Sequence, residues 1–182
     1  MRMFTGMVKT LALLALAAGA AAEAKTYEAI KGESSLSYGM VHPMHHITGV
    51  SRDFLCKVDL SPDTVSSQIK VSAAISSFDS KNSSRDSHAM EMVEAMKYPT
   101  VDFSSSVVKP EGDGYLVSGN LTFHGITHPV SFHVTPKSAG GKVEIIGEFA
   151  VKLSDYKVER PSLLFVPTED KLTIRFDLFA KS

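Results

Sequence analysis

Most of the chain alternates hydrophobic with polar residues, the two-residue period of a β-strand that buries one face. Ile69 and Val71, for example, alternate with Gln68 and Lys70. The same period recurs over residues 36–40, 54–60, 65–76, 101–107, 115–123, 130–134, 143–151 and 172–178. Glycine-containing turns at 111–114, 124–127 and 138–141 separate several of these segments. About eight strands at this spacing predict an all-β domain, an antiparallel barrel or sandwich.

Residues 83–97 break this alternation and predict one inserted α-helix. An apolar stripe at positions i, i+3, i+4 and i+7 consists of Ala89, Met92, Val93 and Met96. Ser83 followed by Asp86 resembles a capping box, and Pro99 ends the helix because the residue before a proline is driven to an extended conformation. The apolar face of this helix must cover something apolar, such as the open end of a barrel.

The first 24 residues have the pattern of a cleavable secretory signal. Arg2 and Lys9 precede a short apolar run over 10–19, which is too short to span a bilayer. Ala22-Glu23-Ala24 then matches a small-x-small cleavage site. We therefore predict export to the periplasm, with residues 25–182 as the mature domain.

Composition narrows the function. The 182 residues are 43% hydrophobic and carry 19 Lys plus Arg against 20 Asp plus Glu, which favours one folded domain and argues against nucleic-acid binding. The single cysteine, Cys56, excludes an intrachain disulfide and is expected to be a buried small hydrophobe. No G-x-S-x-G or H-E-x-x-H motif is present, so neither an enzyme nor a cofactor is expected.

The inward faces of the strands and the helix stripe supply the candidate wall of a ligand cavity. Its proposed members are Phe54, Phe103, Leu121, Phe123, Phe132, Phe149, Phe176, Met92 and Met96. An eight-stranded barrel is either filled by its side chains or holds one ligand, and the sequence leaves both open. A membrane barrel with its apolar face turned outward is the rival, although the chain has no Trp and five Tyr for aromatic girdles.

Two polar groups are candidate sites. Arg85, Asp86 and His88 either bind a ligand headgroup, for which Arg85 suits phosphate or carboxylate, or tie the first helical turn to its neighbours. His42, His45 and His46 lie near Met40 and Met44 and offer the imidazole and thioether ligands that suit copper. The alternative function is therefore a periplasmic protein that handles copper or another metal.

Three motifs resemble those of a known family. Residues 84–88 read SRDSH, 97–105 read KYPTVDFSS and 119–130 read GNLTFHGITHPV. In this order and spacing they resemble the YceI-like family of exported proteins. The resemblance implies a lipocalin-like barrel that holds a polyisoprenoid or similar long-chain lipid without changing it covalently. We accordingly expect a long-chain lipid as the partner, with transient contact to membranes or membrane proteins, and leave a homodimer open.

Overall fold

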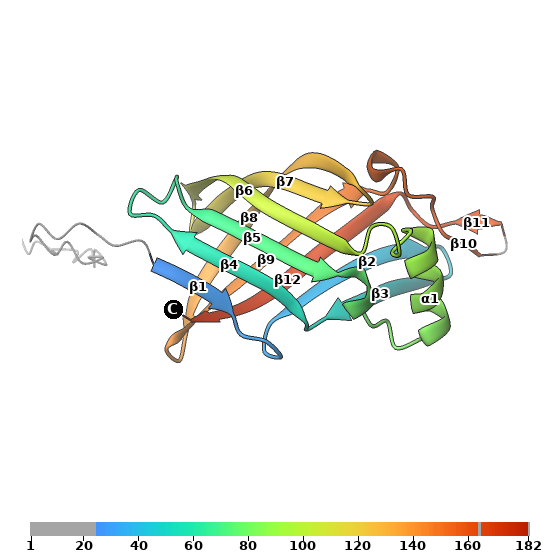
Figure 1. Cartoon of the computed structure of the whole chain (residues 1–182), viewed down its shortest axis with the longest axis horizontal. Helices are drawn as coiled ribbons and strands as arrows, with labels where there is room; N and C mark the ends of the chain where they lie inside the picture. Colours follow the sequence, from blue (N-terminus) through green and yellow to red (C-terminus); the bar gives the residue numbers. More distant parts are fainter. Residues whose placement is uncertain (1–24, 164, 182) are drawn as a thin grey trace, which may run out of the picture.

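The computed structural model describes residues 25–163 and 165–181 (Figure 1). The predicted signal peptide lies outside these residues. The described chain consists mostly of strands, with the ten-residue α1 and two short helices, η1 and η2. No helix in the described residues is long and apolar enough to cross a membrane. The elements in chain order are β1 (Lys25–Ala29), β2 (Ser35–His42), β3 (His45–Ser51), β4 (Phe54–Leu60), β5 (Gln68–Ala74), η1 (Ile75–Ser77), α1 (Ser83–Met92), β6 (Thr100–Glu111), β7 (Gly114–Phe123), β8 (Ile126–Ala139), β9 (Lys142–Lys152), η2 (Ser154–Tyr156), β10 (Ser162–Leu163), β11 (Val166–Pro167) and β12 (Lys171–Lys181).

Eight antiparallel strands close into a barrel. They pair in the order β1-β4-β5-β6-β7-β8-β9-β12, and β12 returns to β1 through Glu28 opposite Lys181 and Ala29 opposite Ala180. The β2–β3 hairpin pairs with the other half of β12, where Thr173 lies opposite Gly39. The predicted antiparallel barrel with one inserted helix is therefore confirmed.

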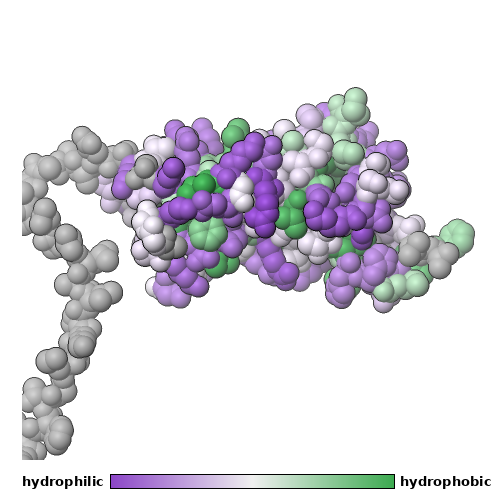
Figure 2. All heavy atoms as spheres, turned by 90° about the horizontal axis from the view of Figure 1, so that it is seen from below, coloured by the Kyte–Doolittle hydropathy of each residue, from purple (hydrophilic) through white to green (hydrophobic). Residues whose placement is uncertain are grey.

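The apolar side chains turn inward. On β7, Val117, Leu121 and Phe123 are buried, whereas Asn120 between them is exposed. Hydrophilic residues cover most of the face in Figure 2, with scattered apolar ones among them. The strands therefore direct their apolar sides to the interior of the barrel, contrary to the rival membrane arrangement.

A β-bulge in β6 changes which residues face inward. The pairing with β7 shifts between Ser105 and Val107, so one extra residue enters β6. A one-residue shift exchanges the two faces of a strand. Val108, only 4% exposed, therefore joins the core, whereas strict alternation predicts Val107 there.

The helix differs from its prediction at both ends. The N-cap is Asn82, whose side chain accepts a hydrogen bond from the backbone N–H of Arg85, and not Ser83. The helix ends at Met92 instead of residue 97, because Glu94 adopts a left-handed φ of 47° and turns the chain. Met96 consequently lies outside the helix stripe and is fully exposed, so its predicted place on the apolar face is wrong.

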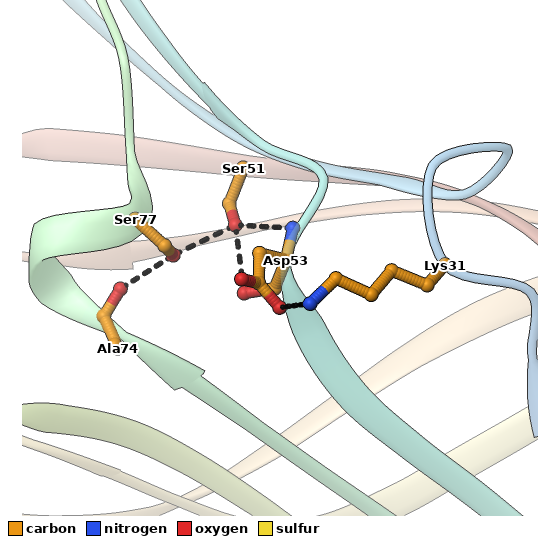
Figure 3. A network of polar contacts seen from close by, with 5 residues as sticks. All are labelled: Lys31, Ser51, Asp53, Ala74 and Ser77. Carbon is orange, nitrogen blue, oxygen red and sulfur yellow. Dashed lines mark hydrogen bonds and ion pairs between the residues drawn. The ribbon is translucent and has the colours of Figure 1, made fainter.

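A small polar network joins the end of the β2–β3 hairpin to the segment before α1 (Figure 3). The hydroxyls of Ser51 and Ser77 are 2.7 Å apart, and Ser77 also donates to the carbonyl of Ala74. Ser51 accepts from the backbone N–H of Asp53, whose carboxylate pairs with Lys31 at 2.7 Å. Because Ser51 is fully buried, these bonds satisfy its polar group and fix η1 against β3.

Candidate ligand-binding site

A cavity of about 400 Å³ occupies the barrel interior. Its walls are almost entirely apolar and include residues from the barrel strands, from β2 and from α1. The cavity extends from the β4–β5 loop, which contributes Ser61 and Thr64, to the helix end, which contributes Ala89 and Met90. This volume lies within the range of about 300–1,000 Å³ that is usual for small-molecule sites. The barrel is hollow, which the sequence alone could not decide.

Aromatic rings form one side of the cavity. Phe132 stacks on Phe149 with ring centroids 4.6 Å apart. The ring centroids of Phe103 and Phe176 lie 5.3 and 5.6 Å from that of Phe132. The edges and faces of these rings offer apolar contact with few rotatable bonds. The group presents a wall against which an extended hydrocarbon chain can pack.

Two inward-facing glycines make room for these rings. A Cβ at Gly147 would lie 2.2 Å from Cζ of Phe176, and one at Gly119 would lie 2.7 Å from Cζ of Phe103. Neither glycine has a positive φ, so their role here is close approach rather than backbone conformation. Each ring lies over bare backbone instead of projecting farther into the barrel.

The structure places most of the predicted wall residues around the cavity. Those on its lining are Phe54, Phe103, Leu121, Phe123, Phe132, Phe176 and Met92. Phe149 stacks on Phe132 and packs against the core without being part of the lining itself, whereas Met96 is exposed, so its predicted position is wrong. Sequence reasoning missed Met90 and Tyr38; Tyr38 lies on the same face of its strand as Met40 and was within reach of the alternation argument.

The three predicted polar residues are divided between the cavity and the surface. Asp86 lines the cavity and accepts hydrogen bonds from the backbone N–H of Ser80 at 3.1 and 3.3 Å. Arg85 donates from Nε to the hydroxyl of Ser80 at 3.0 Å and is not on the lining. His88 is exposed, with Nδ1 3.9 Å from a carboxylate oxygen of Glu91. Of this group, Asp86 alone faces the cavity.

The three histidines of the β2–β3 hairpin have different surroundings. His42 is buried, its Nε2 lies 3.0 Å from the carbonyl of Val166, and its Nδ1 accepts from the backbone N–H of Met44. Both ring nitrogens are thus engaged, which leaves no lone pair free for a metal. His45 and His46 are exposed, and nowhere in residues 25–163 and 165–181 do three or more His, Cys, Asp or Glu side chains form a metal-binding group.

A second histidine anchors the chain that follows α1. His124 Nδ1 lies 2.8 Å from the carbonyl of Tyr156, and its Nε2 lies 2.9 Å from a carboxylate oxygen of Glu94. Both ring nitrogens therefore have a hydrogen-bond partner. The side chain is only 11% exposed and contacts the edge of Tyr98. His124 therefore links the end of the helix region to the β7–β8 turn and η2.

Comparisons with known proteins agree with this architecture. A UPF0312 protein of Vibrio campbellii is 31% identical over 101 residues, which cover 50% of this chain and 53% of that protein. The chain spans about half or less of the length of the curated relatives it matches.

Solved structures show the same fold. Burkholderia cenocepacia BcnA superimposes with a TM-score of 0.77 at 23% identity, covering 84% of this chain and 99% of BcnA. A polyisoprenoid binding domain from Saccharophagus degradans, implicated in plant cell wall breakdown, gives a TM-score of 0.64 at 14% identity, covering 86% and 98%. The family model of the YceI-like domain matches residues 27–180, and the chain therefore belongs to the YceI-like family.

Proposed function

We propose that this protein is an exported lipid carrier that holds a polyisoprenoid or a similar long-chain lipid inside its barrel. The observation that carries the proposal is the apolar cavity of about 400 Å³ along the barrel interior. The polyisoprenoid binding domain from Saccharophagus degradans, which has the same fold, supports the same ligand class. Export to the periplasm rests on the signal pattern of residues 1–24, which leaves residues 25–182 as the carrier.

Burial of a hydrocarbon chain supplies enough free energy for such a role. A tail of about 15 methylenes gains roughly 12 kcal/mol when it is removed from water, at about 0.8 kcal/mol per CH₂. Ordering the tail and desolvating its head offset several kcal/mol of this gain. Micromolar or tighter binding therefore follows from apolar contact alone, and we expect modest selectivity for the chain itself.

The proposed role is non-catalytic. Cys56, the one thiol of the chain, is buried, and this burial raises its pKa to about 11. A thiol with this pKa is protonated at neutral pH and is a poor nucleophile. The residue packs instead with Val58 and Leu178 in a small apolar cluster. This environment supports a packing role for Cys56.

Lipid content of the purified protein tests the proposal directly. Native mass spectrometry of protein from its host should show a bound long-chain lipid that solvent extraction releases. Leu121→Trp, on the cavity wall, should abolish this adduct, whereas Asn120→Trp, on the exposed side of the same strand, should keep it. Protein that is consistently empty and does not take up added lipid would contradict the carrier role.

A further inference from the structure

The charged residues around the cavity indicate which kind of ligand head group it can accept. Among the residues that the structure describes, the lining includes no lysine, arginine or histidine, and its two charged residues are both acidic, Asp86 and Asp102. Asp102 lies between the inward-facing Val101 and Phe103, so its carboxylate is on the outer side of β6. There it accepts a hydrogen bond from the hydroxyl of Thr100. Within the described part of the chain, Asp86 is therefore the one charged side chain that the lining directs into the cavity.

Asp86 and Tyr38 form a polar patch at the helix end of the cavity, which we name the Tyr38–Asp86 patch. Both residues line the cavity, and both the burial of Tyr38 and the nearby Asp86 carboxylate raise the pKa of the Tyr38 phenol. The phenol is thus neutral at physiological pH. Its ring lies against Gly49, where a Cβ would be 2.8 Å from the hydroxyl, and against Phe78 at 5.6 Å between centroids. These contacts hold the hydroxyl at the wall.

The polar atoms of Tyr38 and Asp86 can form more hydrogen bonds than the described residues supply. The two carboxylate oxygens of Asp86 share a single backbone donor, the N–H of Ser80. A carboxylate offers about four lone-pair sites. Among the described residues, the Tyr38 hydroxyl makes no hydrogen bond to another group. A ligand head that donates a hydrogen bond would meet an acceptor here.

Arg85 is the cation near this patch, because its charge lowers the pKa of the Tyr38 phenol, but its side chain does not line the cavity. Its Nε is committed to the hydroxyl of Ser80, and the residue is absent from the lining. A phosphate or carboxylate head at the patch would face the like charge of Asp86 in an apolar cavity, where little water screens the repulsion. The same position suits an uncharged head with a hydroxyl group.

We propose that the Tyr38–Asp86 patch is a head-group subsite that selects uncharged, hydrogen-bond-donating lipids, such as long-chain alcohols and phenols, over lipids with phosphate or carboxylate heads. This inference rests on the proposed function, since it requires the tail to occupy the cavity. The head lies at the helix end, and the tail extends along the aromatic wall toward the β4–β5 loop.

The test compares two probes that differ only in the head. Geranylgeraniol and geranylgeranyl monophosphate compete with a fluorescent lipid for the mature protein, below their aggregation concentrations. We expect the alcohol to bind about 10- to 100-fold more tightly than the phosphate. Asp86→Asn removes the charge and keeps an oxygen for the N–H of Ser80, and it should reduce this preference about tenfold. Asp102→Asn, which removes a carboxylate on the outer side of the wall, is the matched control and should leave the preference unchanged.

Each outcome has a separate meaning. Equal binding of the two probes, or a preference that Asp86→Asn does not change, would overturn the subsite while leaving the lipid carrier intact. Tighter binding of the phosphate, weakened by Arg85→Gln, would show that the guanidinium leaves Ser80 to bind an anionic head. Failure of both probes to bind would contradict the proposed function itself. Thermal unfolding of each variant shows whether the fold is retained.

Discussion

Replacing Gly147 and Gly119, which lie next to rings of the aromatic wall, with alanine distinguishes a hollow barrel from a filled one. At Gly147 the new Cβ would lie 2.2 Å from Cζ of Phe176, so the ring must move. At Gly119 the new Cβ would lie 2.4 Å from the backbone oxygen of Ser104, which belongs to the sheet and cannot move freely. Gly39 on β2 is the control, because a Cβ there would meet its nearest atom at 3.9 Å.

The magnitudes follow from where the displaced atoms can go. Phe176 borders the cavity, so its ring shifts into open space instead of straining a packed core. Gly147→Ala should therefore lower the free energy of unfolding by less than about 1 kcal/mol, part of which is offset by the smaller backbone entropy of alanine in the unfolded chain. Gly119→Ala should cost about 1–3 kcal/mol or more, and Gly39→Ala should be neutral or stabilising by about 0.4–1 kcal/mol.

Gly147→Ala should destabilise the protein less than Gly119→Ala but should weaken lipid binding more. A ring displaced into the cavity excludes about one or two methylenes of a bound tail, which weakens binding about 4- to 14-fold at 0.8 kcal/mol per CH₂. Chemical denaturation of lipid-free protein and lipid titration of each variant measure the two effects. If Gly147→Ala is as destabilising as Gly119→Ala and leaves lipid binding unchanged, the ring has no space to enter and the hollow interior is wrong.

Three further predictions concern α1, the segment that follows it and the core. Glu94→Gln removes the carboxylate that faces His124 and should lower the free energy of unfolding by about 1 kcal/mol, and by less at high salt. Urea unfolding measures the change, and Glu91→Gln, at an exposed position, is the control. Equal effects of the two substitutions would contradict the stabilising contact between Glu94 and His124. Because the thiol of Cys56 has a pKa of about 11 in the folded protein against an ordinary 9.0, the unfolded chain loses its proton first, and stability should fall by about 1.4 kcal/mol per pH unit between pH 9 and 11. Cys56→Ala should abolish that component of the slope, and an unchanged slope would assign it to other groups. Without lipid, backbone amide hydrogen exchange should be faster in α1 than in β7, and bound lipid should slow the exchange of α1. If the amides of α1 are as protected as those of β7 without lipid, the helix is not loosely held.

Alternation of residue types predicted the antiparallel strands and the family resemblance implied the barrel, but neither predicted its local irregularities. The strands around Val117 and Phe123 bury the side that the pattern indicates, because a closed sheet has one inner face. The bulge between Ser105 and Val107 adds one residue to the strand, and no residue type there signals it. As a result, Val108 and not Val107 faces inward. The exposure of Met96 has a similar origin, since the left-handed turn at Glu94 interrupts a stripe that would otherwise continue.

The candidate site was harder to predict because it depends on distances between segments far apart in the sequence. The inward face of a strand can be read from its residues, but whether opposite walls meet depends on ring positions such as that of Phe176 over Gly147. The polar patch combines Tyr38 from β2 with Asp86 from α1, and strand and helix periodicity do not place these two residues together. Sequence reasoning grouped Asp86 with Arg85 and His88 as neighbours, whereas the cavity receives Asp86 alone.

The helix end is the part of the barrel whose opening costs least. None of the residues of α1 is fully buried, although several contribute to the cavity wall, so the helix shares little apolar contact with the rest of the protein. The strands, in contrast, are joined along their lengths by backbone ladders that close on themselves through β1 and β12. The helix is held near its start by the bonds of Arg85 and Asp86 to Ser80, and beyond its end by Glu94 on His124. Since breaking a few polar contacts costs less than parting two strands, we expect the proposed lipid to enter past α1, tail first, and to place its head beside Asp86 as the helix closes.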